Sequence, residues 1–153
     1  MPHAKQQIRE ALVTLLTGLT TTGSRVYKSR VYPSGDDAIP GLNILTGNCP
    51  QDEEFGTLGG LEKWDLENII EARAKPGDGT DVDDQLDTIE AEVTAAIRGD
   101  PTLGNRVMFC KLLPFEPELT DELERPAGIK RMVWQTPFLI LGTDPTNLIF
   151  HGS

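Results

Sequence analysis

The chain is poor in the residues from which most catalytic and metal centres are built. Its 153 residues include two cysteines and two histidines, and aromatic residues make up 6%. The cysteines, Cys49 and Cys110, are far apart and form no CxxC pair. We therefore expect reduced thiols in a cytoplasmic chain, with a structural disulfide as the less favoured alternative. The histidines, His3 and His151, lie at the two ends, which argues against a catalytic triad or a histidine metal site.

Long apolar runs are also missing. No stretch reaches the ~20 apolar residues that cross a membrane, so we expect no membrane partner. The first residues, Met1 to Gln7, lack the apolar run of a signal peptide. Apolar residues make up 38% of the chain, beside 15 glycines and 11 prolines. This composition predicts one domain over residues 1–153 with many loops, and with flexible ends at 1–4 and 148–153.

Negative charge is concentrated in the middle third of the sequence. The net charge is −10. Residues 51–100 contribute −11, whereas residues 1–50 contribute +2 and residues 101–153 contribute −1. An acidic block repels a phosphate backbone, because duplex binding depends on cationic contacts. The charge pattern therefore argues against specific DNA binding, while a surface that repels DNA is compatible with it.

Two segments have the apolar spacing of amphipathic helices. The first runs from Lys5 to Leu19. The second follows Asp81, which can cap it, and is closed by Gly99 and Pro101. The apolar stripes of the two helices consist of Ile8, Leu12, Leu15, Leu16 and Leu19, and of Val82, Leu86, Ile89, Val93 and Ile97.

The remaining apolar segments read as strands. They span residues 24–32, 42–46, 64–74, 106–113 and 128–141. In the third, Trp64, Leu66, Ile70 and Ala72 alternate with Asp65, Glu67, Glu71 and Arg73, which predicts one solvated face. Two residues break this alternation: Asn68 is a polar residue on the apolar face, and Ile69 is an apolar residue on the polar face. Pro137 predicts an edge or a bulge. We expect an α+β fold, with a mainly antiparallel or mixed sheet and two main amphipathic helices packed on it.

No catalytic, cofactor or metal site emerges from the motifs. The acids between Asp78 and Asp87 miss the spacing of an EF-hand calcium loop. The segment Gly56 to Gly60 misses the spacing of phosphate-binding loops. Acidic pairs such as Asp52 with Glu53 or Glu54 occur in any acidic chain and do not by themselves indicate a glycosidase. We therefore expect a protein that is not an enzyme and that holds no cofactor or metal.

Three segments together resemble the tail terminator proteins of siphophages. They read GSRVYKSRVYPSGDDAIPGLNILTG, DDQLDTIEAEVTAAIRGDPTLGN and KRMVWQTPFLILGTDPTN. The resemblance rests on their order, their spacing and the total length, and it extends over most of the chain from Ser24 to Asn147. The acidic loop from Pro114 to Ala127 departs from the family pattern, so no role is carried over to it.

The resemblance implies a structural virion protein at the head-proximal end of the tail, assembled in the host cytoplasm. Such a protein forms a ring, typically a hexamer, which stops polymerisation of the tail tube and joins it to the head connector. The strand–loop–strand segment from Ser29 to Gly47 then makes sense as an assembly surface. Its candidate contact residues are Arg30, Tyr32, Pro33, Asp36, Asp37 and Pro40. The alternative is an ordinary hairpin-like pair within the chain.

Acidic side chains on the second helix are candidates for the ring lumen, where DNA passes without specific binding. They are Asp83, Asp84, Asp87 and Glu90. The alternative is that this helix face keeps the monomer soluble. Two other functions stay open: a different head-completion or head–tail joining protein and, from another class, a small hydrolase whose site lies in the acidic loops.

Overall fold

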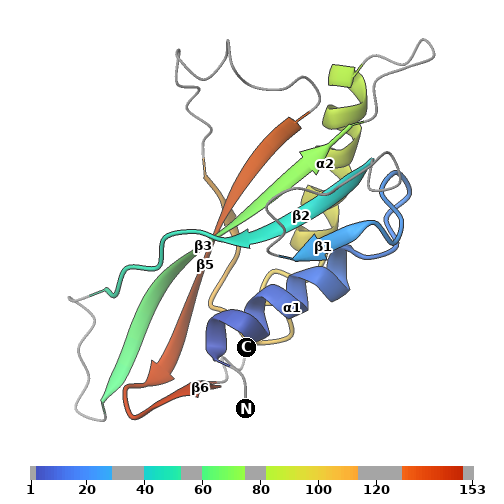
Figure 1. Cartoon of the computed structure of the whole chain (residues 1–153). Coiled ribbons are helices and arrows are strands. Elements are labelled where there is room, and N and C mark those ends of the chain that lie inside the picture. Colours follow the sequence, from blue (N-terminus) through green and yellow to red (C-terminus); the bar gives the residue numbers. More distant parts are fainter. Residues whose placement is uncertain (1–2, 29–39, 53–59, 75–81, 114–128, 150–153) are drawn as a thin grey trace, which may run out of the picture.

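A computed structural model describes residues 3–28, 40–52, 60–74, 82–113 and 129–149. These residues form two helices and a six-stranded mixed sheet, which confirms the predicted α+β class (Figure 1). The elements are α1 (Ala4–Leu16), β1 (Val26–Lys28), β2 (Gly41–Thr46), β3 (Leu61–Arg73), α2 (Val82–Gly99), β4 (Lys111–Leu112), β5 (Ile129–Leu141) and β6 (Asp144–Leu148). Within this described part, no helix is long and apolar enough to span a bilayer.

The long antiparallel pair of β3 and β5 is the backbone of the sheet. Its register is unbroken from Leu61 opposite Leu141 to Arg73 opposite Ile129. Strand β2 pairs antiparallel with β3, and β4 and β6 pair with the other edge of β5. Strand β1 pairs with β2 in parallel. The two strands therefore pair within the chain, as the alternative expected, but in parallel and not as a hairpin, because a hairpin joins antiparallel neighbours.

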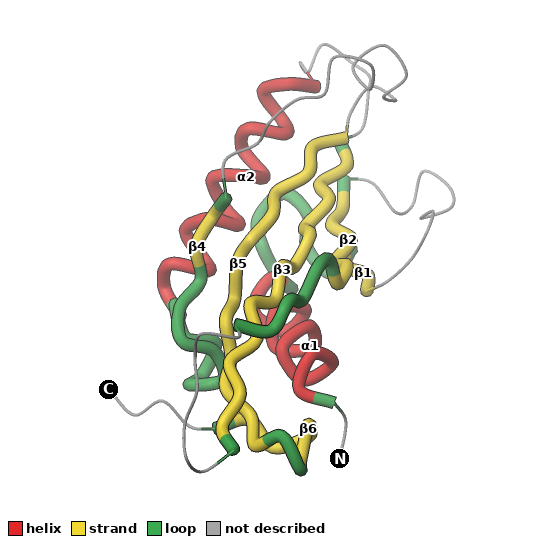
Figure 2. Tube along the Cα trace, turned by 90° about the vertical axis from the view of Figure 1, so that its left-hand side faces the viewer, coloured by secondary structure: helices red, strands yellow, loops and turns green. Residues whose placement is uncertain are grey.

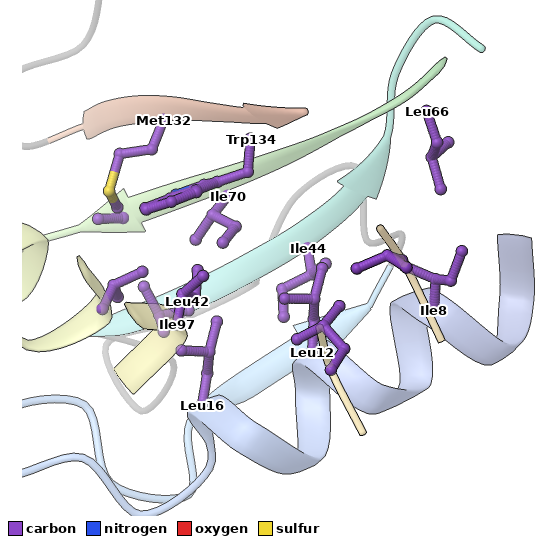
Figure 3. Close-up of a cluster of buried hydrophobic side chains, with 14 of the residues drawn as sticks. Ile8, Leu12, Leu16, Leu42, Ile44, Leu66, Ile70, Ile97, Met132 and Trp134 are labelled. Carbon is purple, nitrogen blue, oxygen red and sulfur yellow. The ribbon is translucent and has the colours of Figure 1, made fainter. Parts of the chain in front are cut away.

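Both helices cover the same face of the sheet, the face formed by even-numbered residues of β2, β3 and β5. Their buried side chains share one core with those strand residues. Figure 2 shows α2 running alongside β5, while α1 contacts β1, β2 and β6. Figure 3 shows the resulting core, in which side chains of α1 and of the strands point toward one another. Its largest fully buried members include Trp134, Phe138, Ile8, Leu12, Leu66, Ile70 and Ile89.

Helix α1 ends three residues earlier than its apolar stripe predicts. Its last helical residue is Leu16, and Gly18 follows with a φ of 97°. This left-handed conformation suits glycine and ends the helix. The N–H of Gly18 then donates a hydrogen bond to the carbonyl of Gly23 at 2.8 Å. The turn formed by the four residues between them replaces the last helical turn, and Leu19 still packs against the core from it.

Pro137 lies neither at a free edge of the sheet nor in a bulge, because its pairing with Asp65 in the β3–β5 ladder is regular. The N–H of Asp65 bonds the carbonyl of Pro50 on the far side of β3. This pair is therefore a non-hydrogen-bonded one, and Pro137 turns its backbone away from β3. On that side its carbonyl accepts from the N–H of Met108 at 2.7 Å. Proline has no N–H to donate, but position 137 lies between the residues of β5 that pair with β4 and those that pair with β6. No ladder hydrogen bond is therefore lost.

Two predicted strands are shorter in the structure. Of residues 106–113, Lys111 and Leu112 alone form a strand, because residues 100–107 close a turn through bonds such as Arg106 N–H to the Thr102 carbonyl at 2.8 Å. Leu103 and Asn105, just before the predicted strand, adopt positive φ in this turn. Of residues 24–32, the described strand is Val26–Lys28. At the chain ends, Ala4 begins α1 and Leu148 ends β6.

Candidate assembly surface

The predicted contact residues of the strand–loop–strand segment are mostly outside the described residues. These are Arg30, Tyr32, Pro33, Asp36 and Asp37, whose role stays a prediction. Pro40 is described, and it directly precedes β2. Its carbonyl accepts a hydrogen bond from the Nε of Arg25 at 2.6 Å, and the Arg25 carbonyl accepts from the N–H of Leu42 at 2.9 Å. These bonds fix the entry to β2 beside β1.

The acidic residues predicted for a lumen lie together in the first three turns of α2. Asp83, Asp84 and Asp87 are exposed, while Glu90 is half-buried. Asp83 and Asp84 sit in the first helical turn, where carboxylates interact favourably with the helix dipole. This position gives them a stabilising role within the subunit that does not depend on any partner.

Lys130 at the start of β5 neutralises part of this acidic group. Its Nζ lies 3.1 Å from Oδ1 of Asp87 and also contacts Oε2 of Glu90. The hydrogen bond with Glu90, followed by that with Asp87, raises the pKa of the lysine above its ordinary value, although burial opposes this. Asp87 stays 71% exposed in the pair, so the ion pair adds little to stability. It links the N-terminal half of α2 to the start of β5.

Glu92 belongs to the same acidic stretch but has a structural role. Its carboxylate accepts from the backbone N of Thr21 at 2.9 Å and from the Thr21 hydroxyl at 2.5 Å. The bonds join α2 to the turn that follows α1, across 71 residues of sequence. Since hydrogen bonds to a charged group are stronger than neutral ones, Glu92 fixes that turn and is not part of an open acidic surface.

The opposite face of the sheet carries no helix among the described residues. It is formed by odd-numbered residues of β2, β3 and β5, and we refer to it as the helix-free face. Three aliphatic residues, Leu45, Ile69 and Val133, are direct neighbours in register across the three strands and are half-buried. They form an apolar row across the middle of this face. The predicted solvated face is therefore not uniformly polar.

A buried carboxylate lies next to this apolar row. Glu71, predicted to be solvated, is buried instead, because two arginines enclose it. Its oxygens lie 2.7 Å from Nη2 of Arg73 and 3.1 Å from Nε of Arg131. The side chain of Arg131 remains 61% exposed. One carboxylate between two guanidinium groups leaves a net positive charge at this end of the helix-free face.

A cleft of about 360 Å³ lies between α1 and the turn after α2. It is lined by Gln7, Glu10, Ala11, Thr14, Leu15, Asp100, Leu103 and Arg106. Burial raises the pKa of both free thiols, to about 12 for Cys110. No cluster of three or more metal-ligating side chains occurs within the described ranges.

Sequence reasoning missed the helix-free face, although one signal was present. Ile69 breaks the polar alternation of its strand, and the register shows that Leu45 and Val133 flank it. The pairing of strands cannot be obtained from one strand alone, so the three residues could not be joined into a row. The positions of Arg73 and Arg131 around Glu71 depend on the same register.

Most of the net negative charge lies outside the described ranges. The described residues hold 11 lysines and arginines against 13 aspartates and glutamates, a net charge of −2, so the other segments contribute −8 of the total of −10. The described surface is therefore a mixture of both signs, and the position of each charge matters more than the sum.

No protein-family profile matches the chain, and the search of curated proteins finds no significant match.

Proposed function

We propose that the chain is the subunit of a phage tail terminator, a ring that caps the tail tube, stops its polymerisation and joins it to the head connector. The observation that supports this best is the one-sided fold. Two helices cover one face of the sheet, while the described part of the other face presents an apolar row flanked by charge. A structural subunit needs such a surface for its neighbours, whereas an enzyme needs a convergent polar site.

The partners follow from this proposal. They are further copies of the chain, the tail tube protein and the head connector protein, and DNA passes through the ring without specific binding. Of the four acids predicted for a lumen, Asp83, Asp87 and Glu90 lie on the flank of α2 next to Lys130 and are proposed to face the passage, whereas Asp84 lies on the outward side of the helix. Exposed carboxylates there would keep a polyanion from adhering.

Removal of the protein from the virus that encodes it tests the proposal. A nonsense mutation in its gene should give tails of irregular, excessive length that do not join heads, and expression of the intact chain from a plasmid should restore uniform tails. Tails of normal length without the protein would contradict the proposal. Normal length combined with failure to join heads would indicate another head–tail joining protein, the nearer alternative.

The acidic loops of the hydrolase alternative lie mostly outside the described residues.

A further inference from the structure

We infer that the helix-free face of one subunit binds the outward stripe of α2 from the next subunit. This inference rests on the proposed ring and identifies the two surfaces that form it. The outward stripe consists of residues on the side of α2 opposite its buried positions, namely Asp84, Thr88, Ala91, Ala95 and Arg98. All five are exposed, whereas Leu86, Ile89, Val93 and Ile97 are buried on the other side.

The apolar parts of the two surfaces fit by size. Ala91 and Ala95 lie on adjacent turns of the outward stripe, and their side chains project little beyond the helix backbone. A helix with small side chains can approach a sheet closely, so that Leu45, Ile69 and Val133 would lose their remaining contact with water. The sheet would then be covered by its own helices on one face and by a neighbour's helix on the other, which is the usual two-sided burial of a sheet core.

Charged and apolar residues follow one another in the same order on both surfaces, and the charges at each end are of opposite sign. The outward stripe begins with Asp84, continues with the two alanines and ends with Arg98. The helix-free face begins with Arg73 and Arg131, continues with the apolar row and then reaches Glu67. Arg98 and Glu67 have no ion-pair partner among the described residues, so this contact would supply one to each.

The spacing of the charges agrees on the two surfaces. Asp84 and Arg98 are separated by 14 residues of helix, which is about 21 Å. Along β3, Glu67 is about 13 Å from the row of Glu71 and Arg131 and about 20 Å from Arg73. The reach of the arginine side chains closes the remaining difference. Lys111 on β4 is in register with Gln135 on β5, which in turn pairs with Glu67. Lys111 thus lies two strands away from Glu67, at the edge of the sheet.

The contact is heterologous, because the two surfaces are different parts of the chain. Repeated contacts of this kind close into a ring when the rotation between neighbours allows it. A two-fold dimer would instead bring identical surfaces together.

Disulfide cross-linking tests this directly. In a chain with Cys49→Ser and Cys110→Ser, we would introduce Ala91→Cys and Ile69→Cys together and oxidise the protein alone and after addition to tail tubes. The expected product is a ladder of covalent multimers, since each subunit can be linked to two neighbours. Either cysteine alone should give no product larger than a dimer.

Charge exchange provides a second test that leaves the core untouched. Arg98→Glu should raise the dissociation constant of the oligomer at least about tenfold, because it faces Glu67 with a like charge. The double variant with Arg98→Glu and Glu67→Arg should restore assembly. Ala91→Trp should block assembly, whereas Thr14→Trp, at a position on α1 that is also exposed, should not.

The outcomes separate the inference from the proposed function. An oligomer that forms without a cross-linked ladder, and that tolerates Ala91→Trp, overturns the inference and leaves the ring in place. A chain that stays monomeric at every concentration and on tail tubes overturns both. Melting curves that match the parent show that each variant is folded.

Discussion

Asn68 on β3 donates a 2.7 Å hydrogen bond to the hydroxyl of Thr136 on β5, and both side chains are fully buried. Thr136 in turn lies 3.3 Å from the carbonyl of Leu66. This polar pair lies within the apolar core, on the face covered by the helices. It explains why a polar residue interrupts the apolar side of β3 at position 68.

The pair leads to a prediction about stability. Thr136→Val removes the partner of the Asn68 amide and should reduce the free energy of unfolding by about 1–3 kcal/mol, the cost of an unsatisfied buried polar group. Adding Asn68→Leu should recover much of this loss, because both polar groups are then gone. Denaturant titration of the two single variants and the double variant measures the coupling. Additive effects would show that the two side chains do not interact.

A second prediction concerns the packing of α2. Ile89 is fully buried in the core between α2 and the sheet. Ile89→Asp places an unpaired charge there and should cost about 4–5 kcal/mol or more, enough to unfold a domain of ordinary stability. Thr88→Asp, one residue earlier and exposed, is the matched control and should melt like the parent. Circular dichroism on heating distinguishes them, and a parent-like melt for Ile89→Asp would mean that the buried face is misassigned.

The third prediction concerns DNA. If the flank of α2 faces the passage, Asp83→Lys with Asp87→Lys should leave the ring intact and make it retain duplex DNA. Exposed charges contribute little to stability, and each added cation near a phosphate releases a counterion. The retention should therefore fall steeply as salt is raised, in a filter-binding assay.

A control for this experiment uses acids from another part of the chain. Glu118→Lys with Asp121→Lys makes the same change in net charge within the acidic loop, outside the described residues. If the loop variant retains as much DNA as the helix variant, the helix has no special place at the passage. The acidic helix face would then be better explained by solubility.

The two thiols give a fourth prediction, on pH. Burial raises the pKa of Cys110 from its ordinary value of 9.0 to about 12. The thiol therefore ionises in the unfolded chain before it does so in the folded one. Folded-state stability should fall as the pH rises from about 9 toward 12. Cys110→Ala should remove this part of the pH dependence, measured by denaturant midpoints at pH 8 and pH 10, while Cys49→Ala should remove less.

Reactivity offers an independent check on the same residue. The thiolate is the reactive form, so Cys110 should alkylate slowly in the native protein at pH 8 and quickly in denaturant. Rapid native labelling of Cys110 would contradict its raised pKa.

Much of the fold could be predicted from local patterns. The stripes of Ile8 and Leu12 and of Ile89 and Val93 repeat at helical spacing, and β3 and β5 alternate over many residues. Residues 106–110 could not be distinguished from a strand, because a turn with Leu103 in a left-handed conformation leaves no such repeat. The parallel pairing of β1 depends on a contact with β2 that local sequence does not encode.

The candidate surface was less predictable than the fold. Asp83, Asp84 and Asp87 were recognisable as an exposed acidic group because helical spacing alone places them together. The burial of Glu71 depends on Arg131, 60 residues later in the chain. The pairing of Glu92 with Thr21 spans 71 residues of sequence. Such contacts arise from tertiary structure, and they decide which of the acids remain available to partners.

The mass of the assembled protein tests the central claim most directly. Native mass spectrometry over a wide concentration range, alone and with tail tubes, should find monomer and one closed cyclic oligomer, because a heterologous contact closes at a fixed number of subunits. Negative-stain images of the same samples should show rings at one end of each tube. A stable two-fold dimer at every concentration, with bare tube ends, would contradict the claim.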